Sequence, residues 1–364
     1  MNILWLSWKD RTHPLAGGAE TVSTEIRKHL LLDGHEVRLL TSRYPGSKSQ
    51  EVVDGTEITR LGNRFSVYPR VFIYFRRHLK NWPDLIIDEM NTVPFGCAFY
   101  SRKQRVLVTY QLSRQVWLYQ LPVPFSLIGY AIEPLYLKAL SNKYPRIITI
   151  SDSTRQELVK HGFKASSIRL FRVGINLKPV AKLPKKPTRT TVLSLGALRP
   201  MKRTLEIIKA FEVARDQNSK LKLVVAGDTS GKYAARVMKY AAASRHSKAI
   251  SLKGRVPNRE RIALMRAAGL IVVTSIKEGW GLIVTEANSQ GTPAVVYDTD
   301  GLRDSVKHNV TGLLVPNSDY QKLGEAINDL LVDQATYDRL REQAWRWSQE
   351  FTLENSYQDF VKAL

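Results

Sequence analysis

The chain has 364 residues, of which 43% are hydrophobic and 24% are charged, and its 21 Gly and 16 Pro are scattered. This composition excludes a disordered, collagen-like or low-complexity protein. The length favours two domains, because one domain usually holds about 100–200 residues. The single cysteine, Cys97, excludes an intramolecular disulfide and a cluster of thiolate metal ligands, and it favours a reducing compartment.

The charge is strongly basic, with 55 Lys and Arg against 33 Asp and Glu, a net charge of +22. Residues 1–180 hold 26 basic and 14 acidic side chains, and the remainder hold 29 and 19. Such a chain attracts anions, and phosphate-bearing substrates, anionic lipid headgroups and nucleic acid all qualify. Because no tail carries the excess, a nucleic-acid binder with a basic arm is disfavoured.

The start of the chain, Met1 to Ser7, has no basic residues before its apolar run, so it is predicted to be a first strand rather than a signal peptide. The longest uncharged stretch, Gln115 to Ile132, is interrupted by Pro122 and Pro124. It is therefore predicted to be a surface loop leading into a helix, and not a membrane span. These features predict a cytoplasmic protein.

Short β-branched runs alternate with segments of helical period along the chain. This alternation predicts parallel sheets with crossover helices, an α/β fold. The predicted strands are Ile3–Leu6, Val37–Leu40, Asp84–Ile87, Val106–Thr109 and Ile147–Ile150, followed by Val192–Leu195, Leu221–Ala226, Leu270–Thr274 and Ala294–Tyr297.

The segment Asn176–Thr188 separates the two groups of strands. It has three prolines, four lysines and no acidic residue, which is typical of a linker. Two α/β domains joined in this way are expected to bind a ligand at the carboxyl ends of their strands, in a cleft between them. The final segment, Tyr320 to Leu364, is predicted to be helical.

The strongest local motif begins with Glu278 and ends with Glu286. It follows a predicted strand, turns through two glycines and enters a short helix, so the backbone N–H groups of Gly281 and Leu282 are predicted to face an anion. Two alternatives stay open at this point. The pair could be the acid and nucleophile of a glycosidase-like site, or one solvated loop residue and one solvated helix residue.

Two further turns carry candidate anion ligands. Arg199 and Lys202 follow the strand Val192–Leu195 at the entry to a helix, where a pyrophosphate could bind both; the alternative is a solvated basic surface. Gly17 and Gly18 follow the first strand and let the backbone approach a phosphate or a sugar, or they serve only a tight turn. Because this motif is not G-x-G-x-x-G, a dehydrogenase is disfavoured.

Together these motifs resemble the retaining GT-B glycosyltransferases of glycosyltransferase family 4, over essentially the whole chain. Glu278 to Glu286 matches the E-x7-E element of that family, and Gly196 to Lys202 matches its phosphate loop. The resemblance implies two Rossmann-like domains whose parallel sheets face a central cleft. Residues 1–178 would bind the acceptor and 179–340 the nucleotide sugar, while a helical tail over 341–364 would stay with the second domain or pack back on the first.

The same resemblance assigns roles to individual residues. Glu286 would hold the ribose hydroxyls of the donor, Glu278 the transferred sugar, and Arg199 with Lys202 the diphosphate. Val256 would contact the base through its backbone. The full set of implied donor-binding residues is Gly17, Gly18, Arg199, Lys202, Val256, Glu278, Gly279, Trp280, Gly281, Leu282 and Glu286.

One position departs from the family pattern. The family commonly has a histidine after its fifth strand, near the reacting sugar, whereas this chain has Tyr110 there, or Gln111 with a shift of one residue. The implied catalytic set is therefore Glu278, Arg199, Lys202 and Tyr110. Positive side chains and a helix N-terminus would stabilise the departing diphosphate, so no metal and no cofactor is expected.

Basic and aromatic residues alternate between Glu57 and Asp84, where no acid occurs. Helical spacing from Pro69 places Arg70, Arg76, Arg77 and Lys80 on one side and an apolar face opposite. This helix is a candidate for adsorption to an anionic membrane surface or for acceptor binding. The alternative is that its apolar face belongs to the core.

The sequence thus predicts a metal-independent retaining glycosyltransferase. It would move a sugar from a UDP- or GDP-sugar to a glycan or lipid-linked acceptor, as a cytoplasmic protein or peripherally at the inner face of a membrane. A nucleotide-sugar epimerase of the same fold and a basic nucleic-acid-binding protein are the alternatives. No nucleic-acid partner is expected.

Overall fold

The computed structural model describes residues 1–186, 188 and 190–364, so Pro187 of the predicted linker lies outside the described residues. The chain forms two compact units. Unit 1 consists of Met1–Gly174 with Thr352–Leu364, and unit 2 of Ile175–Phe351. The predicted tail 341–364 is divided between them, since helix α12 (Gln334–Ser348) belongs to unit 2 and helix α13 (Leu353–Ala363) to unit 1.

Unit 1 is built on an eight-stranded sheet with the order β3-β4-β2-β1-β5-β6-β7-β8. All neighbouring strands are parallel except β3 and β4, which form an antiparallel hairpin. The strands are β1 (Asn2–Leu6), β2 (Glu36–Thr41), β3 (Gln50–Val53), β4 (Thr56–Arg60), β5 (Leu85–Glu89), β6 (Gln104–Val108), β7 (Ile147–Thr149) and β8 (Ile168–Leu170). The five strands predicted in this half are present; the hairpin and β8 were not predicted.

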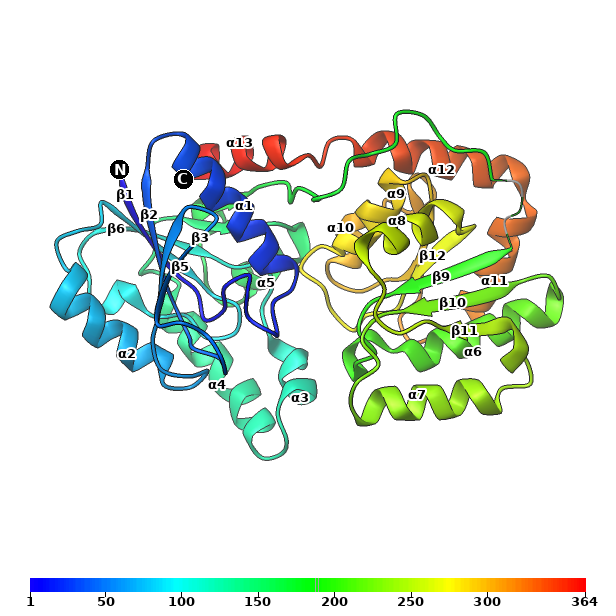
Figure 1. Ribbon diagram of the computed structural model, residues 1–364, viewed down its shortest axis with the longest axis horizontal. Helices are drawn as coiled ribbons and strands as arrows, with labels where there is room; N and C mark the ends of the chain where they lie inside the picture. Colours follow the sequence, from blue (N-terminus) through cyan, green and yellow to red (C-terminus); the bar gives the residue numbers. More distant parts are fainter. Residues whose placement is uncertain (187, 189) are drawn as a thin grey trace. The chain divides into compact units, whose positions relative to one another are not determined.

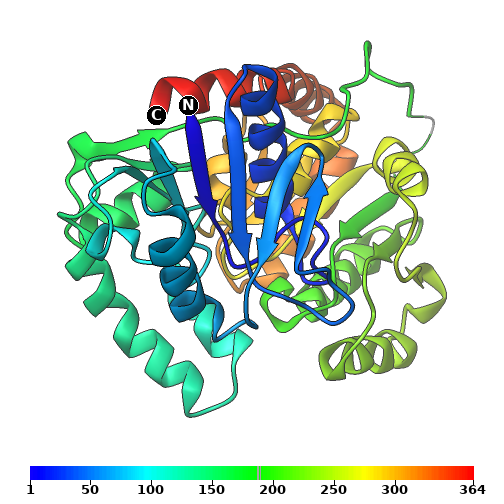
Figure 2. The ribbon, with the colours of Figure 1, turned by 60° about the vertical axis from the view of Figure 1, so that its left-hand side comes forward.

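Helices cover both faces of this sheet (Figures 1 and 2). Successive side chains of β1 point to opposite faces of the sheet. Leu4 packs in one cluster with helices α2 and α4, whereas the ring of Trp5 stacks on Phe360 of α13 at 5.9 Å. The helices are α1 (Gly18–Leu32), α2 (Val67–Tyr74, continued by a π-helical turn Phe75–Leu79), α3 (Trp117–Gln120), α4 (Phe125–Leu140), α5 (Asp152–Lys160) and α13.

The candidate membrane helix of the sequence analysis is α2 with its π-helical turn. Its apolar face is core: Val71, Phe75 and Leu79 are buried in the cluster that also holds Leu137 and Leu140 of α4. The exposed residues on this segment include all four of the predicted basic residues, Arg70, Arg76, Arg77 and Lys80. Of the two alternatives for this helix, the structure supports the one in which Val71, Phe75 and Leu79 belong to the core, while Phe72 remains 40% exposed.

Unit 2 is built on a six-stranded sheet with the order β11-β10-β9-β12-β13-β14, all parallel. Its strands are β9 (Thr191–Leu195), β10 (Lys222–Ala226), β11 (Ile250–Leu252), β12 (Leu270–Val273), β13 (Ala294–Tyr297) and β14 (Gly312–Val315). Val192 and Leu193 of β9 face opposite clusters. The four strands predicted here are present, and β11 and β14 were not predicted.

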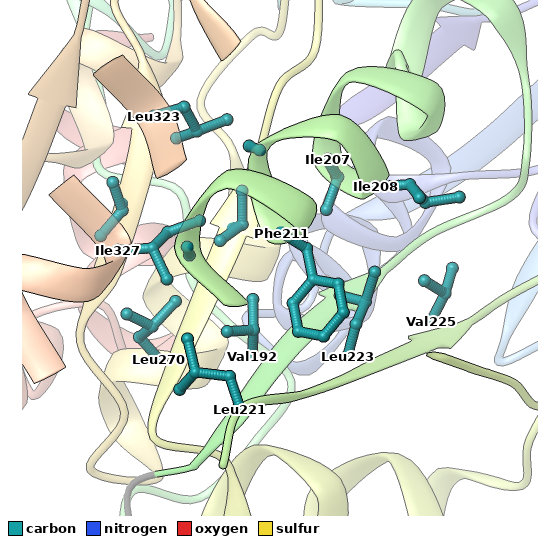
Figure 3. Close-up of a cluster of buried hydrophobic side chains, with 14 of the residues drawn as sticks. Val192, Ile207, Ile208, Phe211, Leu221, Leu223, Val225, Leu270, Leu323 and Ile327 are labelled. Atoms are coloured by element: carbon teal, nitrogen blue, oxygen red, sulfur yellow. The ribbon is translucent and has the colours of Figure 1, made fainter. Parts of the chain in front are cut away.

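Helices cover both faces of the second sheet as well. Figure 3 shows one core, in which Phe211 of α6 lies over Val192 and Leu223, and Leu323 of α11 closes the other side. The opposite core contains Met265 of α8 and Val284 of α9. The helices are α6 (Thr204–Gln217), α7 (Lys232–Ala243), α8 (Asn258–Ala267), α9 (Leu282–Ser289), α10 (Leu302–Ser305), α11 (Tyr320–Val332) and α12.

Two parallel-sheet units with helices on both faces confirm the predicted α/β class. The predicted linker, however, is packed along unit 2. The Val180 N–H donates to the Ser289 carbonyl at 2.9 Å, and the Val180 carbonyl accepts from the Trp345 indole at 2.9 Å. The Nζ of the half-buried Lys186 donates to Thr292 Oγ1 at 2.6 Å, and desolvation lowers the pKa of Lys186 to about 6.

Candidate active site

The candidate donor residues of unit 2 follow the carboxyl ends of its strands. The chain runs outward from β9 through β10 to β11, and then crosses to β12 on the other side of β9. The loops after β9 and β12 therefore meet at the point where the strand order reverses, the usual ligand position in an open parallel sheet. These loops carry Arg199, Lys202 and Glu278.

Lys202 and Glu278 form an ion pair between the two loops. The Lys202 ammonium donates to Glu278 Oε1, which also accepts from the Ser275 hydroxyl at 2.6 Å. The side chains of Lys202 and Glu278 keep 33% and 20% of their surface exposed. Thr274 Oγ1 donates to the Lys202 carbonyl at 2.8 Å and so fixes one loop against the other. Neither Ser275 nor Thr274 was predicted from the sequence, because no local motif marks them.

Glu286 lies on the second turn of α9 and is held by a side chain that sequence reasoning did not find. The two terminal nitrogens of Arg261, Nη1 and Nη2, donate to its carboxylate oxygens, with Nη2 at 3.3 Å from Oε1. Arg261 lies on α8, which packs on the same face of the sheet as α9. Only the fold joins these two residues, and no local motif in the sequence marks Arg261.

The N-terminus of α9 is open. Its N-cap is Gly281, with φ of 85°, and no side chain caps the helix. Glycine suits this position because the conformation is left-handed and a Cβ there would lie 2.8 Å from Ser305 Oγ. The first N–H groups of a helix have no intrahelical acceptor, so they are available to an anion.

The remaining predicted donor residues differ in exposure and contacts. Arg199 is exposed at the start of the turn that contains Lys202, and Val256 is half-exposed between β11 and α8. Trp280 packs its ring against Phe351 at 5.1 Å and Trp347 at 6.0 Å, and its indole donates to Thr285. Its ring therefore anchors the loop against α12, and only the backbone of Gly279 and Trp280 remains as a ligand candidate.

Unit 1 places its predicted residues differently. The Gly17 N–H donates to Glu20 Oε2 at 2.6 Å, and the Lys9 ammonium lies 3.0 Å from Glu20 Oε1. The chain's own carboxylate thus occupies the position at Gly17 that was predicted for a phosphate, although Gly17 and Gly18 are exposed. The Gly17 N–H is therefore used by Glu20 in this structure, and a donor contact at Gly17 and Gly18 stays a prediction.

Tyr110 follows β6 but does not face solvent. Its side chain is 6% exposed and its hydroxyl oxygen is buried. Burial, and then the charge of Glu89, raise the Tyr110 pKa well above its usual value. A contact with a reacting sugar needs exposure, so the predicted catalytic role of Tyr110 is not compatible with this arrangement. The alternative, Gln111, is half-exposed.

A buried carboxylate lies beside Tyr110 at the carboxyl end of β5. Glu89 accepts hydrogen bonds from the Trp5 indole at 2.6 Å, the Ser7 hydroxyl at 3.3 Å and the Asn91 amide at 3.2 Å. Desolvation, followed by the nearby negative charge of Glu20, raises the Glu89 pKa to about 7. Among the described residues, no group of three or more His, Cys, Asp and Glu side chains is arranged to hold a metal ion.

Two family models match the chain in succession. "Glycosyltransferase Family 4" matches residues 16–178, and "Glycosyl transferases group 1" matches residues 178–347. The chain belongs to the GT-B glycosyltransferases of the family 4 type. The two matched ranges meet close to the boundary between the two units.

Among curated proteins, the chain is similar to a poly(glycerol-phosphate) alpha-glucosyltransferase of Bacillus subtilis. The identity is 29% over 186 residues, 51% of this chain and 27% of that protein. It is also similar to a D-inositol 3-phosphate glycosyltransferase of Rhodococcus jostii, with 28% identity over 212 residues, 57% of this chain and 46% of that protein. The chain therefore spans less than half the length of these curated relatives.

Solved structures share the fold over the whole chain. A sucrose-phosphate synthase from Thermosynechococcus elongatus has a TM-score of 0.81 and 21% identity, and the match covers 99% of this chain and 97% of that one. Anabaena HepE, solved with UDP and glucose, has a TM-score of 0.75 and 17% identity, covering 100% and 98%. At these identities the match establishes the GT-B fold alone, which confirms the predicted fold class.

Proposed function

We propose that the protein is a retaining glycosyltransferase that takes a sugar from a nucleoside-diphosphate donor bound to unit 2. One observation carries this proposal. Two cation–carboxylate pairs, Lys202 with Glu278 and Arg261 with Glu286, flank the uncapped N-terminus of α9 at the reversal point of the sheet. Family membership supports the same reaction class.

The proposed roles follow from charge. As the sugar leaves, the diphosphate gains negative charge, which Lys202, Arg199 and the N–H groups at the start of α9 would stabilise. Lys202 would turn from Glu278 toward the phosphates, leaving the Glu278 carboxylate to accept hydrogen bonds from sugar hydroxyls. Glu286 would accept from the ribose hydroxyls beside Arg261. These groups account for the leaving-group charge without invoking a metal.

Thermal unfolding with added nucleotide tests the donor. Stabilisation by UDP or by GDP, and not by an oligonucleotide, is the expected result, and the reverse would favour the nucleic-acid alternative. The comparison of UDP with GDP also identifies the base; the UDP in the HepE structure favours UDP. Product analysis with UDP-sugars separates transfer from epimerisation.

Glu286→Ala tests the ribose contact. We expect nucleotide binding to weaken about tenfold, because hydrogen bonds to a charged group contribute about 1.5–3 kcal/mol. Glu260→Ala is the matched control, since Glu260 lies on α8 of the same unit and pairs with Lys253 at 3.0 Å instead. Unchanged nucleotide affinity in Glu286→Ala would remove this role.

We further propose that unit 1 binds the acceptor, through an anionic group. A pocket of about 350 Å³ lies where β2 and β4 end and is lined by Arg43, Asn63, Ser66 and Arg70. Arg60 is also at its wall, but Asp10 and Glu51 already neutralise it. The phosphate-bearing acceptors in the names of the two curated relatives support this chemistry. Changing Arg43 and Arg70 to Ser should weaken glycerol 3-phosphate binding and leave UDP binding unchanged.

The acceptor is proposed to be a glycan or a lipid-linked precursor met at an anionic membrane surface, at its cytoplasmic face. The exposed cations Arg70, Arg76 and Arg77 of α2 and its π-helical turn, with Lys80 directly after the turn, support this location. Replacing Arg76, Arg77 and Lys80 by Ser should reduce binding to anionic vesicles, because each cation near such a surface contributes about 1 kcal/mol. Equal binding before and after the change would leave these residues as ordinary solvated charges.

A further inference from the structure

The hairpin of α3 and α4 has inverted polarity. On a surface helix the polar residues normally face water. Here Ser126 and Glu133 of α4 are each 1% exposed, whereas Val123 before the helix is 73% exposed, Phe125 62% and Leu135 68%. The other large apolar side chains exposed on this hairpin are Leu118, Tyr119, Leu127, Ile128, Tyr130 and Ile132.

The one charged residue between positions 115 and 137 is used inside the hairpin. The Glu133 carboxylate accepts from the Ser113 N–H at 2.8 Å and from the Trp117 indole at 3.0 Å, and also from the Arg114 N–H. It therefore ties the start of the hairpin to the inner face of α4. The outer surface of α3 and α4 is left without a charge until Lys138.

Residues 58–151, which include this uncharged surface, are rich in cations. They contain 13 Lys and Arg but four Asp and Glu, and of these four, Asp88, Glu89 and Glu133 are buried. Asp84 is the one exposed acid of the segment, and it accepts from the Asn2 N–H at 2.8 Å. α2, with its exposed cations, lies on the same face of the sheet as α4 because both helices pack into one core.

We propose that the α3–α4 hairpin inserts its apolar surface into an anionic lipid bilayer, with the exposed cations of α2 and its π-helical turn on the headgroups. A second copy of the chain is a poorer occupant, since it would bring two cationic surfaces together on a protein of net charge +22. Nucleic acid would leave the apolar side chains uncovered. The loop that joins α3 to α4 extends beyond the rest of unit 1 in both views, which suits insertion (Figures 1 and 2).

This inference rests on the proposed membrane location of the acceptor and names the element that inserts. Lying in the interface requires an apolar face flanked by cations, and no spanning helix. Among the described residues, no helix is long and apolar enough to cross a bilayer. The other candidate for membrane adsorption, α2, has Val71, Phe75 and Leu79 buried in the core.

Selective labelling provides a direct test of insertion. The single native cysteine, Cys97, is buried, so a cysteine introduced at an exposed position is the one that an environment-sensitive dye labels. Labelled Val123→Cys should shift its emission to the blue when vesicles of phosphatidylcholine with about one third phosphatidylglycerol are added. Labelled Leu32→Cys should not respond, although Leu32 in the same unit is 82% exposed. Equal responses at both positions, or no response at Val123→Cys, would overturn the proposal.

Vesicle sedimentation measures the contribution of the surface. The double change Val123→Ser with Phe125→Ser should weaken partitioning into these vesicles at least about tenfold, since it exposes far less apolar area. Leu32→Gln is the matched control and should bind like the natural chain. Binding should weaken on neutral vesicles and with added salt. Unaltered partitioning, or a change of oligomeric state without a change in partitioning, would show that something other than lipid covers the hairpin.

Membrane insertion of the hairpin and the proposed transferase function are tested by different assays. Vesicle binding is measured without a sugar donor, and UDP binding is measured without vesicles. If the double variant Val123→Ser with Phe125→Ser loses vesicle binding but is stabilised normally by UDP, insertion of the hairpin is supported, whatever the transfer assay yields. The substituted side chains are exposed, so the melting temperatures of these variants should match that of the natural chain, and they serve as the folding control.

Discussion

Two helices of this molecule begin in the same way but differ in whether their N-terminus is available to an anionic ligand. α1 and α9 each follow a strand of a parallel sheet and each has a glycine at its N-cap, Gly17 and Gly281. In α1, the third helical residue is Glu20, whose carboxylate accepts from the Gly17 N–H. In α9, the corresponding residue is Val284, which is fully buried in the core. α1 therefore supplies its own anion, and α9 leaves the position to a ligand.

The comparison teaches that a glycine turn before a helix is not by itself an anion site. The third helical position is buried in both helices, since Glu20 is 2% exposed and Val284 is 0% exposed. The surroundings decide: the Gly17 N–H and the Lys9 ammonium compensate the charge of Glu20, whereas Val284 packs in an apolar cluster, where a buried carboxylate would be costly. The carboxylates of unit 2, Glu278 and Glu286, instead lie beside the helix start, each paired with a cation.

The largest expected effect comes from removing a cation beside the open helix. Lys202→Ala should lower the rate of sugar transfer or of donor hydrolysis by about 100-fold or more, as the loss of one preorganised group opposite a developing charge usually does. Lys239→Ala, an exposed lysine on α7, is the matched control and should keep the natural rate. A Lys202→Ala enzyme within threefold of the control, on the scale of about 0.7 kcal/mol, would break the assignment of the open helix to the leaving group.

The second effect concerns the buried carboxylates of unit 1. The Glu89 pKa is raised from 4.5 to about 7 by burial, so folding favours the protonated form. Its stabilising contribution is complete below the unfolded pKa and is lost as the pH rises through the folded pKa. Between about pH 5 and pH 8 this loss amounts to about 2–3 kcal/mol.

Glu89→Gln tests that loss. It keeps an oxygen acceptor for the Trp5 indole, so it should make the free energy of unfolding fall less steeply over this pH range. Burial also raises the pKa of Asp88, so the free energy of unfolding of the variant should still fall somewhat with pH. Denaturant unfolding at about pH 5 and about pH 8 measures this fall. An identical pH dependence in the variant would mean that Glu89 is ionised in the folded protein.

Sequence patterns predicted the α/β class and most strands because the buried runs are apolar and β-branched, and burial is what makes those runs readable. The short strands β3, β8 and β11 have exposed positions that weaken this signal. The loop with Glu278 was predictable because glycines, a strand end and a helix start are local features. Arg261 was not, since it reaches Glu286 only when α8 and α9 pack together.

The predictions that failed depend on tertiary packing, which a local sequence pattern does not contain. Helical periodicity identifies an apolar face but not what covers it, so the sequence left both a membrane and the core open for α2, and the structure places Val71, Phe75 and Leu79 in the core. Conversely, the inverted polarity of α4 has no signature in periodicity, because it depends on which side of the helix the sheet occupies. Tyr110 occupies the expected place in the sequence, but its ring lies within unit 1.

A smaller effect is expected at the cap of α9. Gly281→Ala forces a Cβ into the left-handed region and against Ser305 Oγ, at 2.8 Å. We expect unit 2 to lose about 2 kcal/mol, of which about 1 kcal/mol is the backbone cost. Gly231→Ala separates the two contributions, because Gly231 is also an N-cap glycine, with φ of 92°, but has open space around it. Equal losses in thermal unfolding would show that the contact with Ser305 contributes nothing.

The smallest effect is expected where the comparison began, at the carboxylate that fills the start of α1. Glu20→Gln retains an oxygen for the Gly17 N–H but loses the charge that attracts both the helix dipole and the Lys9 ammonium. We expect a loss of about 1 kcal/mol of unfolding free energy, within the usual range for a cap. Glu25→Gln on the same helix is the control, since Glu25 pairs with Lys28 near the surface and should cost less. A different outcome is that Glu20→Gln leaves the stability unchanged and that phosphate then stabilises unit 1 against unfolding. In that case the start of α1 could bind an anion as α9 is proposed to do, and the Glu20 carboxylate would merely take the place of that anion.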